Sequence, residues 1–190
     1  MAKKFGYRSR SAYKLKQLDE RFGILKDAKN VLDLGAAPGG WLQVVAEKIG
    51  GDGFVLGVDL KQIERLDSKN VETIIGDVTS PNIIEKIEEK FSGAFDLVLS
   101  DLSPNISGVW ELDHVRQIDL SARAMEIALK VLDPKGWMVL KVFQGSEFNR
   151  FLEEARRNFK HVWVFKPKAS RKGSAEVYIA ANGLKRKRVG

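Results

Sequence analysis

The sequence predicts a doubly wound α/β domain, in which a mainly parallel sheet is covered by helices on both faces. Seven short apolar runs rich in β-branched residues are separated, for the most part, by segments with helical periodicity. Near-continuous apolar strands are typical of parallel sheets that are buried on both faces. At 190 residues and 44% hydrophobic, the chain is long enough for one sizeable core and short for two. We therefore expect a single domain over residues 1–190.

The expected elements alternate along the chain. Strands are expected at residues 30–35, 53–60, 71–77, 95–101, 137–143, 161–165 and 176–180. Helices are expected at residues 11–21, 40–49, 81–91, 113–132 and 146–158. Because only a basic loop separates the last two strands, we expect them to pair as an antiparallel hairpin at or near one edge of the sheet.

Positive charge is concentrated outside the middle of the chain. The formal net charge is +7, yet residues 17–165 hold 18 basic and 24 acidic residues. The excess of positive charge lies in a basic N-terminal arm (about 1–10) with the helix after it, in the loop 166–173, and in a basic C-terminal tail (about 184–190). Such clusters can simply keep a protein soluble, but three of them around an acidic body favour a polyanion-binding face.

The composition also disfavours several classes of protein. The chain has no cysteine and only two histidines, which excludes disulfides and thiolate metal sites, and we expect no metal. No apolar run reaches the roughly 18 residues of a membrane helix, and no signal-peptide core follows the basic N-terminus. We therefore expect a cytoplasmic protein with no membrane partner, and a monomer.

The stretch VLDLGAAPGGW (31–41) joins the first expected strand to the helix after it. Turns at the carboxyl ends of strands are where open α/β sheets bind ligands. Gly35, Gly39 and Gly40 would let the backbone approach a ligand closely, and the helix N-terminus would offer N–H groups to an anion such as a carboxylate. A tight connection that binds nothing is the alternative.

Four successive strands carry an aspartate at or near their carboxyl ends: Asp33, Asp59, Asp77 and Asp101. Each could cap a helix, but a series along one rim favours a ligand, and Asp59 stands where a carboxylate accepts hydrogen bonds from ribose hydroxyls. The turn lacks the pattern G-x-G-x-x-G and the chain has no phosphate loop, which disfavours a nicotinamide dinucleotide. An acidic rim suits a nucleoside with a sulfonium and an amino group, namely S-adenosylmethionine.

Six segments, in this order and spacing, resemble the FtsJ/RrmJ family of ribose 2′-O-methyltransferases. They are SAYKL (11–15), DLGAAPGGW (33–41), GVDL (57–60), SDLSPNISG (100–108), LKVFQG (140–145) and SAEVYIA (174–180). The resemblance covers essentially the whole chain. It is closest to the members that methylate a uridine ribose in 23S, large-subunit ribosomal RNA. The partner that it implies is therefore this ribosomal RNA, on the assembled large ribosomal subunit.

The same resemblance implies a Rossmann-like S-adenosylmethionine-dependent methyltransferase fold, with a mainly parallel seven-stranded sheet and an antiparallel edge hairpin. The family's catalytic Lys-Asp-Lys-Glu set falls on Lys14, Asp101, Lys141 and Glu176. Independently, Lys141 is unusual in the apolar strand WMVLKVF, although a snorkelling lysine is the alternative explanation. We expect Lys141 to be the general base toward the 2′-oxygen and the other three to orient it. A protonated Lys141 that stabilises the developing alkoxide is the other possibility.

The strand ends and the resemblance together predict the ligand contacts. For S-adenosylmethionine these are Gly39 and Trp41 at the turn, Asp59 for the ribose hydroxyls, Asp77 for the adenine amino group and Asp101 near the sulfonium; Trp41 could instead pack against the sheet. RNA phosphates are expected on Lys3, Lys4, Arg8, Arg10, Lys168, Arg171 and Lys172. Phe5, Tyr7 and Tyr13 could stack an unpaired base or pack in the core.

Three other functions remain alternatives. A tRNA ribose methyltransferase would share the chemistry. A noncatalytic RNA-binding ribosome-assembly factor would share the fold, but the complete lysine and carboxylate set speaks against it. A small-molecule methyltransferase would share the cofactor, but the segregated basic clusters speak against that.

Overall fold

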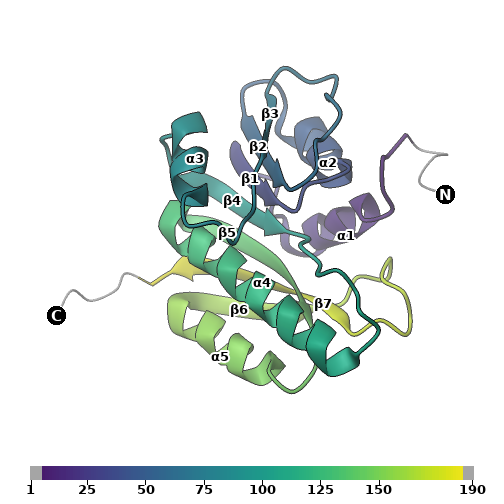
Figure 1. Cartoon of the computed structure of the whole chain (residues 1–190). Coiled ribbons are helices and arrows are strands. Elements are labelled where there is room, and N and C mark those ends of the chain that lie inside the picture. The colour runs from purple at the N-terminus through teal and green to yellow at the C-terminus, as the bar shows by residue number, and fades with distance from the viewer. Residues whose placement is uncertain (1–5, 186–190) are drawn as a thin grey trace.

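A seven-stranded sheet forms the centre of the computed structural model, which describes residues 6–185 (Figure 1). The strands are β1 Asn30–Leu34, β2 Phe54–Asp59, β3 Val71–Ile75, β4 Phe95–Ser100, β5 Leu132–Phe143, β6 Phe159–Phe165 and β7 Glu176–Leu184. Their order is β3-β2-β1-β4-β5-β7-β6. The pairs from β3 to β5 are parallel, and β7 is antiparallel to both β5 and β6. The predicted fold class is therefore confirmed.

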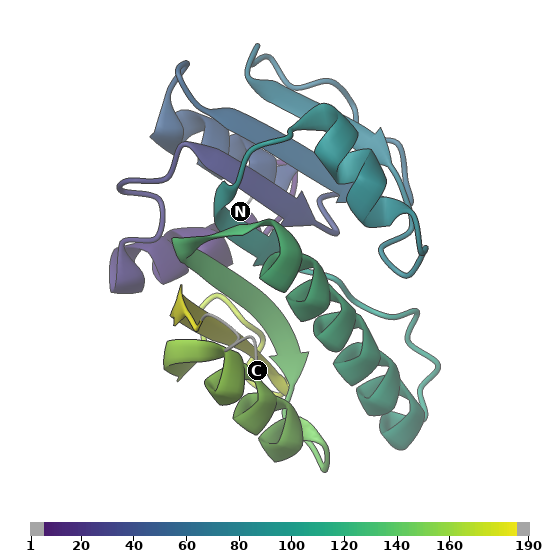
Figure 2. The ribbon, with the colours of Figure 1, turned by 90° about the vertical axis from the view of Figure 1, so that its left-hand side faces the viewer.

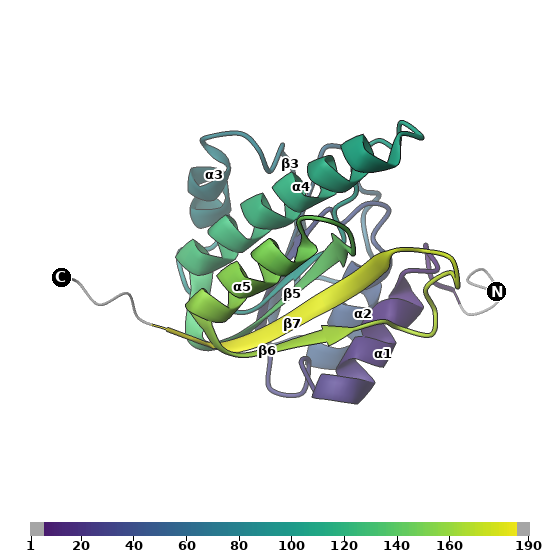
Figure 3. The same cartoon turned by 90° about the horizontal axis from the view of Figure 1, so that it is seen from below.

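Five helices cover the two faces of this sheet within the described residues. Helices α1 Ala12–Phe22 and α2 Gly40–Ile49 lie on one face, and α3 Ile83–Lys90, α4 Trp110–Val131 and α5 Phe148–Asn158 lie on the other (Figures 2 and 3). Each layer encloses its own hydrophobic cluster. In β1, for example, Val31 belongs to the cluster under α1 and α2, while Leu32 and Leu34 belong to the opposite cluster. None of these helices combines the length and the apolar composition that crossing a membrane requires.

Central strands are buried on both faces because helices cover them on both sides. Four of the five residues of β1 are buried, whereas the edge strands β3 and β6 are largely exposed. This burial explains why the central strands are mostly apolar on both faces instead of alternating with polar residues. The length of an apolar run in the sequence therefore indicates whether a strand lies in the centre of the sheet or at its edge.

Strands β5, β6 and β7 and helix α4 are longer than predicted. Strand β5 begins at Leu132, which pairs with Phe95 across an irregularity in the ladder, although the segment DPKG (133–136) has the composition of a turn. Strand β6 begins at Phe159, and β7 runs on to Leu184 because β6 pairs with it from Tyr178 to Leu184. Helix α4 begins three residues earlier than expected, at Trp110. The predicted hairpin of the last two strands is confirmed, with β6 at the edge and β7 inside the sheet.

Candidate active site

A pocket of about 500 Å³ opens at the carboxyl ends of the parallel strands. It lies where the chain order reverses, because β2 and β3 extend to one side of β1 and β4 lies on the other. Ligands bind at such switch points in open α/β sheets. Three of the predicted cofactor residues line the pocket from three different strand ends: Asp59, Asp77 and Asp101.

The turn after β1 is held by its own hydrogen bonds. The Asp59 carboxylate accepts the N–H of Ala37 at 2.9 Å, and the C=O of Val58 accepts those of Gly35 and Ala36 at 2.8 and 3.1 Å. The N–H of Gly39 donates to the C=O of Ala36 at 2.7 Å. These four N–H groups are therefore used by acceptors in the turn and in β2, whereas the prediction that the N-terminus of α2 offers N–H groups to an anion concerns the residues from Gly40 on and stays a prediction.

Gly35 is required by the close approach of the loop after β4. Its φ is +77°, and a Cβ atom built there would lie 2.9 Å from the Cδ2 atom and 3.1 Å from the Cα atom of Leu102. Side chains other than hydrogen are strained at such a φ. The glycine thus lets the loop that carries Asp101 lie against the turn that lines the pocket.

Asp77 stays ionised at the open side of the pocket. Its carboxylate accepts the hydroxyl of Thr79 at 2.7 Å and the N–H of the same residue at 2.8 Å. These hydrogen bonds, the hydroxyl first, hold the pKa of Asp77 below its ordinary value. A charged acceptor of the kind that could bind an adenine amino group is therefore present at the pocket, and no residue within 6–185 forms an ion pair with it.

Asp33 lies beneath the pocket and not on its rim. It is the fourth residue of β1, it is completely buried, and neither carboxylate oxygen has a hydrogen-bond partner among the described residues. Burial, together with the charges of Asp101 and Asp59, raises the pKa of Asp33 well above its ordinary value. The expectation that four aspartates share one rim is therefore corrected to three, because a residue inside the strand cannot reach the surface that its neighbours border.

The Asp33→Asn variant should gain stability relative to the wild type as pH rises. When the pKa of a carboxyl is higher in the folded than in the unfolded protein, its protonated form favours folding. This contribution to the free energy of unfolding is complete below the ordinary pKa of 3.8 and is lost as pH rises to the pKa in the folded protein. The loss is about 1.4 kcal/mol for each unit by which the pKa is raised. Urea unfolding of both proteins from acidic to neutral pH measures this difference, and parallel pH profiles would contradict it.

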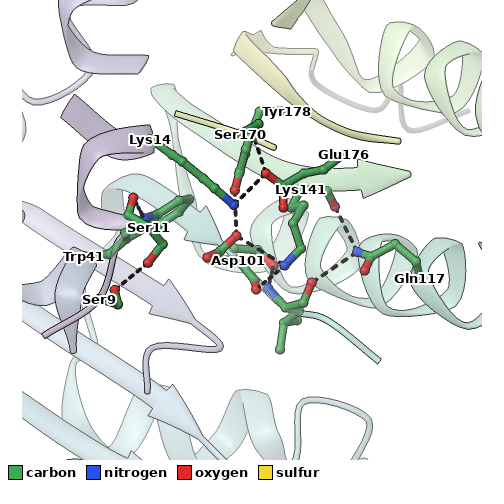
Figure 4. A network of polar contacts seen from close by, with 12 residues as sticks. Ser9, Ser11, Lys14, Trp41, Asp101, Gln117, Lys141, Ser170, Glu176 and Tyr178 are labelled. Atoms are coloured by element: carbon green, nitrogen blue, oxygen red, sulfur yellow. Dashed lines mark hydrogen bonds and ion pairs between the residues drawn. The ribbon is translucent and has the colours of Figure 1, made fainter. Parts of the chain in front are cut away.

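Lys141 and Asp101 form the first of two ion pairs beside the pocket (Figure 4). The Nζ atom of Lys141 lies 3.3 Å from a carboxylate oxygen of Asp101 and donates to the backbone C=O of the same residue at 2.8 Å. The Lys141 side chain is only 6% exposed, so the lysine does not snorkel to the surface. Strand β5 therefore delivers an amine to the aspartate that also borders the pocket.

The second ion pair joins α1 to the start of β7. The Nζ atom of Lys14 lies 2.6 Å from an Oε atom of Glu176, and the hydroxyl of Ser170 donates to the same oxygen at 2.9 Å. Both charged side chains are mostly shielded from solvent, at 17% and 11% exposure. The four residues that the resemblance predicted as a set are thus brought together as two adjacent pairs.

Tyr178 connects the two pairs, although no prediction included it. Its hydroxyl donates to the Asp101 carboxylate at 2.7 Å, and the ammonium of Lys14 lies 5.9 Å from the centre of its ring (Figure 4). Burial, then the charges of Asp101 and Glu176, raise the pKa of Tyr178 well above its ordinary value, so it stays a neutral donor. Its position two residues after Glu176 in a strand was a usable signal, because such residues share one face.

A polar contact of α4 fixes the backbone under both pocket and ion pair. The amide of Gln117 donates to the C=O groups of Leu102 and Lys141, each at 3.2 Å. The hydroxyl of Ser121, one turn later, donates to the same C=O of Lys141 at 2.8 Å. Two buried polar residues four positions apart on an otherwise apolar helix face could have indicated this contact from the sequence.

Gly39 and Trp41, also predicted to contact the cofactor, are not among the residues that line the pocket. The indole of Trp41 is 2% exposed, donates to the C=O of Ser11 at 2.8 Å and packs against the ring of Tyr178. Gly39 is the residue before α2, with a φ of +105°. The Trp41 side chain therefore packs in the core, which is the alternative to a cofactor contact that the sequence left open. Contact of Gly39 or of Trp41 with the cofactor stays a prediction.

The guanidinium of Arg8 holds backbone carbonyl groups. It donates to the C=O of Pro38 at 3.2 Å, of Glu64 at 2.6 Å and of Arg65 at 2.9 Å. These bonds tie the N-terminal segment to the glycine turn and to the loop after β2. They use only part of the five N–H donors of the guanidinium, so the phosphate contact of Arg8 stays a prediction.

Replacing Arg8 by alanine should destabilise the protein. The lost hydrogen bonds are charge-assisted but only partly buried, so we expect a loss of about 1–3 kcal/mol, which lowers the Tm by about 2–12 °C at this chain length. Arg10→Ala is the matched control, because Arg10 is exposed and only two residues away. Thermal unfolding of both variants measures the effect, and equal Tm values would contradict it.

The other predicted RNA contacts divide by exposure. Lys168, Arg171 and Lys172 are exposed in the loop between β6 and β7, next to Ser170 of the second ion pair. Tyr7 is buried, and its hydroxyl donates to Glu47 at 2.7 Å. It therefore packs in the core, the alternative to stacking an unpaired base. Tyr13 packs against the cluster under α1 and α2. Lys3, Lys4, Phe5 and the tail from residue 186 lie outside the described residues.

Comparison with known proteins agrees with this geometry. A family model of FtsJ-like methyltransferases matches residues 7–184. A ribosomal RNA large subunit methyltransferase E from Methanothrix thermoacetophila is 50% identical over 183 residues, which are 96% of this chain and 70% of that protein. Its counterpart of the same name in Methanothermobacter thermautotrophicus is 45% identical, over 98% of this chain and 88% of that protein.

A solved structure assigned as a ribosomal RNA methyltransferase from Plasmodium falciparum has the same fold. It superposes with a TM-score of 0.82 at 28% identity, over 94% of this chain and 98% of that one. The resemblance predicted from the six segments is confirmed over nearly the whole length. The chain belongs to the FtsJ-like methyltransferase family.

Proposed function

We propose that the protein uses S-adenosylmethionine to methylate the 2′-hydroxyl of a uridine ribose in 23S, large-subunit ribosomal RNA. One observation carries the proposal. Asp101 lines the pocket and at the same time holds Lys141 and Tyr178, so the predicted methyl-donor site and the buried amine share one residue. A methyl transfer to a hydroxyl needs this juxtaposition of a donor site and a proton acceptor.

The pocket residues fit S-adenosylmethionine by their chemistry. They offer carboxylates for ribose hydroxyls and amino groups, while the N–H groups of Gly35, Ala36, Ala37 and Gly39 already donate to acceptors in the turn and in β2. Asp59 would hold the ribose hydroxyls, Asp77 the adenine amino group, and Asp101 the methionine end. When bound, the cofactor supplies a methyl group that its sulfonium sulfur activates.

Lys141 is the proton acceptor in this proposal. A ribose hydroxyl becomes a good nucleophile only as its proton is removed, and an amine within hydrogen-bond reach can take that proton. The two contacts with Asp101 fix the direction of the amine. Lys14 and Glu176 of the neighbouring ion pair would position the ribose, and the hydroxyl of Tyr178 donates to the Asp101 carboxylate and helps to keep it in place.

The RNA would lie over the end of the sheet where the loop between β6 and β7 exposes its cations. Lys168, Arg171 and Lys172 stand beside the second ion pair, so phosphates flanking the target ribose could bind there. Relatives named as ribosomal RNA large subunit methyltransferases support large-subunit RNA as the substrate. We expect the assembled subunit as the natural substrate and the protein to act as a monomer in the cytoplasm.

The test is transfer of labelled methyl from S-adenosylmethionine to undermethylated large ribosomal subunits, naked ribosomal RNA and tRNA in parallel, followed by mapping of the modified nucleotide. Label in a uridine ribose of large-subunit RNA is the expected result. Label only in tRNA would leave the chemistry standing and overturn the substrate. Binding of the cofactor without any transfer would favour the assembly-factor alternative.

A further inference from the structure

An exposed tryptophan stands near the catalytic residues at the start of α4. Trp110 is 45% exposed, and residues 106–115 contain four further exposed aliphatic side chains. Exposed apolar patches on soluble proteins mark contact surfaces. The aliphatic members are Ile106, Val109, Leu112 and Val115.

The ring of Trp110 belongs to a stack of three aromatic side chains. It lies 6.1 Å from the ring of Phe143 and 5.8 Å from that of His114, with planes inclined by only 18° and 21°. His114 is 1% exposed and accepts the N–H of Glu147 at 3.1 Å, so the base of the stack is fixed. The stack therefore holds the ring of Trp110 in a fixed orientation, while 45% of this side chain stays exposed to solvent.

The position of this stack is tied to the catalytic residues on three sides. Phe143 is two residues beyond Lys141 in β5, about 7 Å along a strand, and pairs directly with Glu176 of β7. Gln117, on the second turn of α4, donates to the C=O of Lys141. A flat group resting on Trp110 would thus lie at a defined offset from the amine.

The loop that precedes Trp110 is also anchored. The Asp113 carboxylate accepts the N–H and hydroxyl of Ser107, each at 2.8 Å, and the N–H of Gly108 at 3.1 Å. Earlier residues of the same loop, Ser103 to Asn105, line the cofactor pocket. The segment that carries the tryptophan is therefore continuous with the pocket and held against α4.

From this arrangement we propose that Trp110 is a stacking platform for an unpaired base of the RNA next to the methylated nucleotide. The inference rests on the proposed function. A ribose that reaches Lys141 must be unstacked from its helix, and exposed aromatic rings bind the bases that this frees. In Figure 1 the first turn of α4 lies at the same end of the sheet as the basic loop between β6 and β7, so one strand could contact both.

A nucleobase is favoured over a protein partner because of the stack itself. Side chains of a partner protein would use the aliphatic neighbours as well as the ring, whereas a base needs only the flat π surface. The nearly parallel planes of Trp110, Phe143 and His114 extend such a surface toward the catalytic strand. A protein partner is therefore an outcome that the test must be able to reveal.

The test compares Trp110→Ala, Trp110→Leu and Trp110→Phe with the wild type. The leucine variant keeps apolar bulk without a ring, and the phenylalanine variant keeps a ring. Trp163→Ala is the matched control, because Trp163 is 37% exposed and belongs to the edge strand β6. The first probe is a series of short single-stranded uridine-rich RNAs, each with one 2-aminopurine, whose fluorescence falls when it stacks on a ring.

We expect one labelled position to be quenched by the wild type, the phenylalanine variant and the Trp163 control, and not by the alanine or leucine variants. On undermethylated large subunits the KM for RNA should rise about 5- to 100-fold in the alanine variant, with kcat and binding of S-adenosylhomocysteine roughly unchanged. Full activity of the leucine variant would overturn the proposal. A raised KM with unchanged quenching would also overturn it and indicate a protein partner.

The two proposals fail in different ways. If the wild type transferred no methyl to ribosomal RNA, the proposed function would fail, and the fluorescence series would still decide whether Trp110 stacks a base. If the wild type methylated RNA but Trp110 quenched no labelled position, the proposal that Trp110 stacks a base would be wrong, and the proposed function would be unaffected.

Discussion

Replacement of Lys141 by alanine should lower the rate of methyl transfer by a factor of about 10² to 10⁴, the usual contribution of a general base. The amine is buried, and its two contacts with Asp101 point it at the junction with the cofactor pocket. No other described lysine contacts Asp101 in the same way. Single-turnover transfer of labelled methyl measures the effect, and binding of S-adenosylhomocysteine should persist in the variant.

Two companion variants make this result interpretable. Lys135→Ala removes an exposed lysine at the opposite end of the same strand and should leave the rate unchanged. Lys141→Arg keeps the positive charge, but a guanidinium does not lose its proton in proteins. If the arginine variant kept full activity, stabilisation of the alkoxide would replace general-base catalysis.

Replacement of Asp59 by alanine should weaken binding of S-adenosylhomocysteine by about 10² to 10⁴-fold. Two charge-assisted hydrogen bonds to ribose hydroxyls would be lost, each worth about 1.5–3 kcal/mol. The variant also loses the acceptor for the N–H of Ala37, which fixes the glycine turn beside the pocket. Both consequences act in the same direction, so the effect should exceed that of losing one ligand contact.

Titration calorimetry with S-adenosylhomocysteine measures this affinity without any RNA. Asp52→Ala is the matched control, because Asp52 is exposed in the turn that precedes the same strand and does not line the pocket. Asp59→Asn separates the two contributions, since an amide oxygen can still accept from Ala37. Unchanged affinity in the alanine variant would show that Asp59 does not hold the ligand.

Most of the fold could be predicted from the sequence because local physics agrees with the final structure. Apolar runs separated by helical periodicity indicated the strands, and the glycine turn and Asp59 fell at the strand ends where pockets form. The family resemblance placed Lys14, Asp101, Lys141 and Glu176 as one set, and the structure brings all four side chains to the same end of the sheet.

Prediction was least complete where a distant contact decides the outcome. Arg8 lies in a basic arm, and only folding shows that three backbone C=O groups accept hydrogen bonds from its guanidinium. Asp33 looks like a rim carboxylate until the packing of helices on both sides of β1 buries it. Neither outcome depends on nearby sequence.

By itself the sequence determined the class of fold, the strand ends that border the pocket, the family and the residue types of the predicted catalytic set. The tertiary structure decided which partners these residues have: two ion pairs connected by Tyr178, with Gln117 bonded to the backbone of Lys141. The physical reason is range. Periodicity and turn chemistry act over a few residues, whereas hydrogen-bond partners and burial are set by segments far apart along the chain.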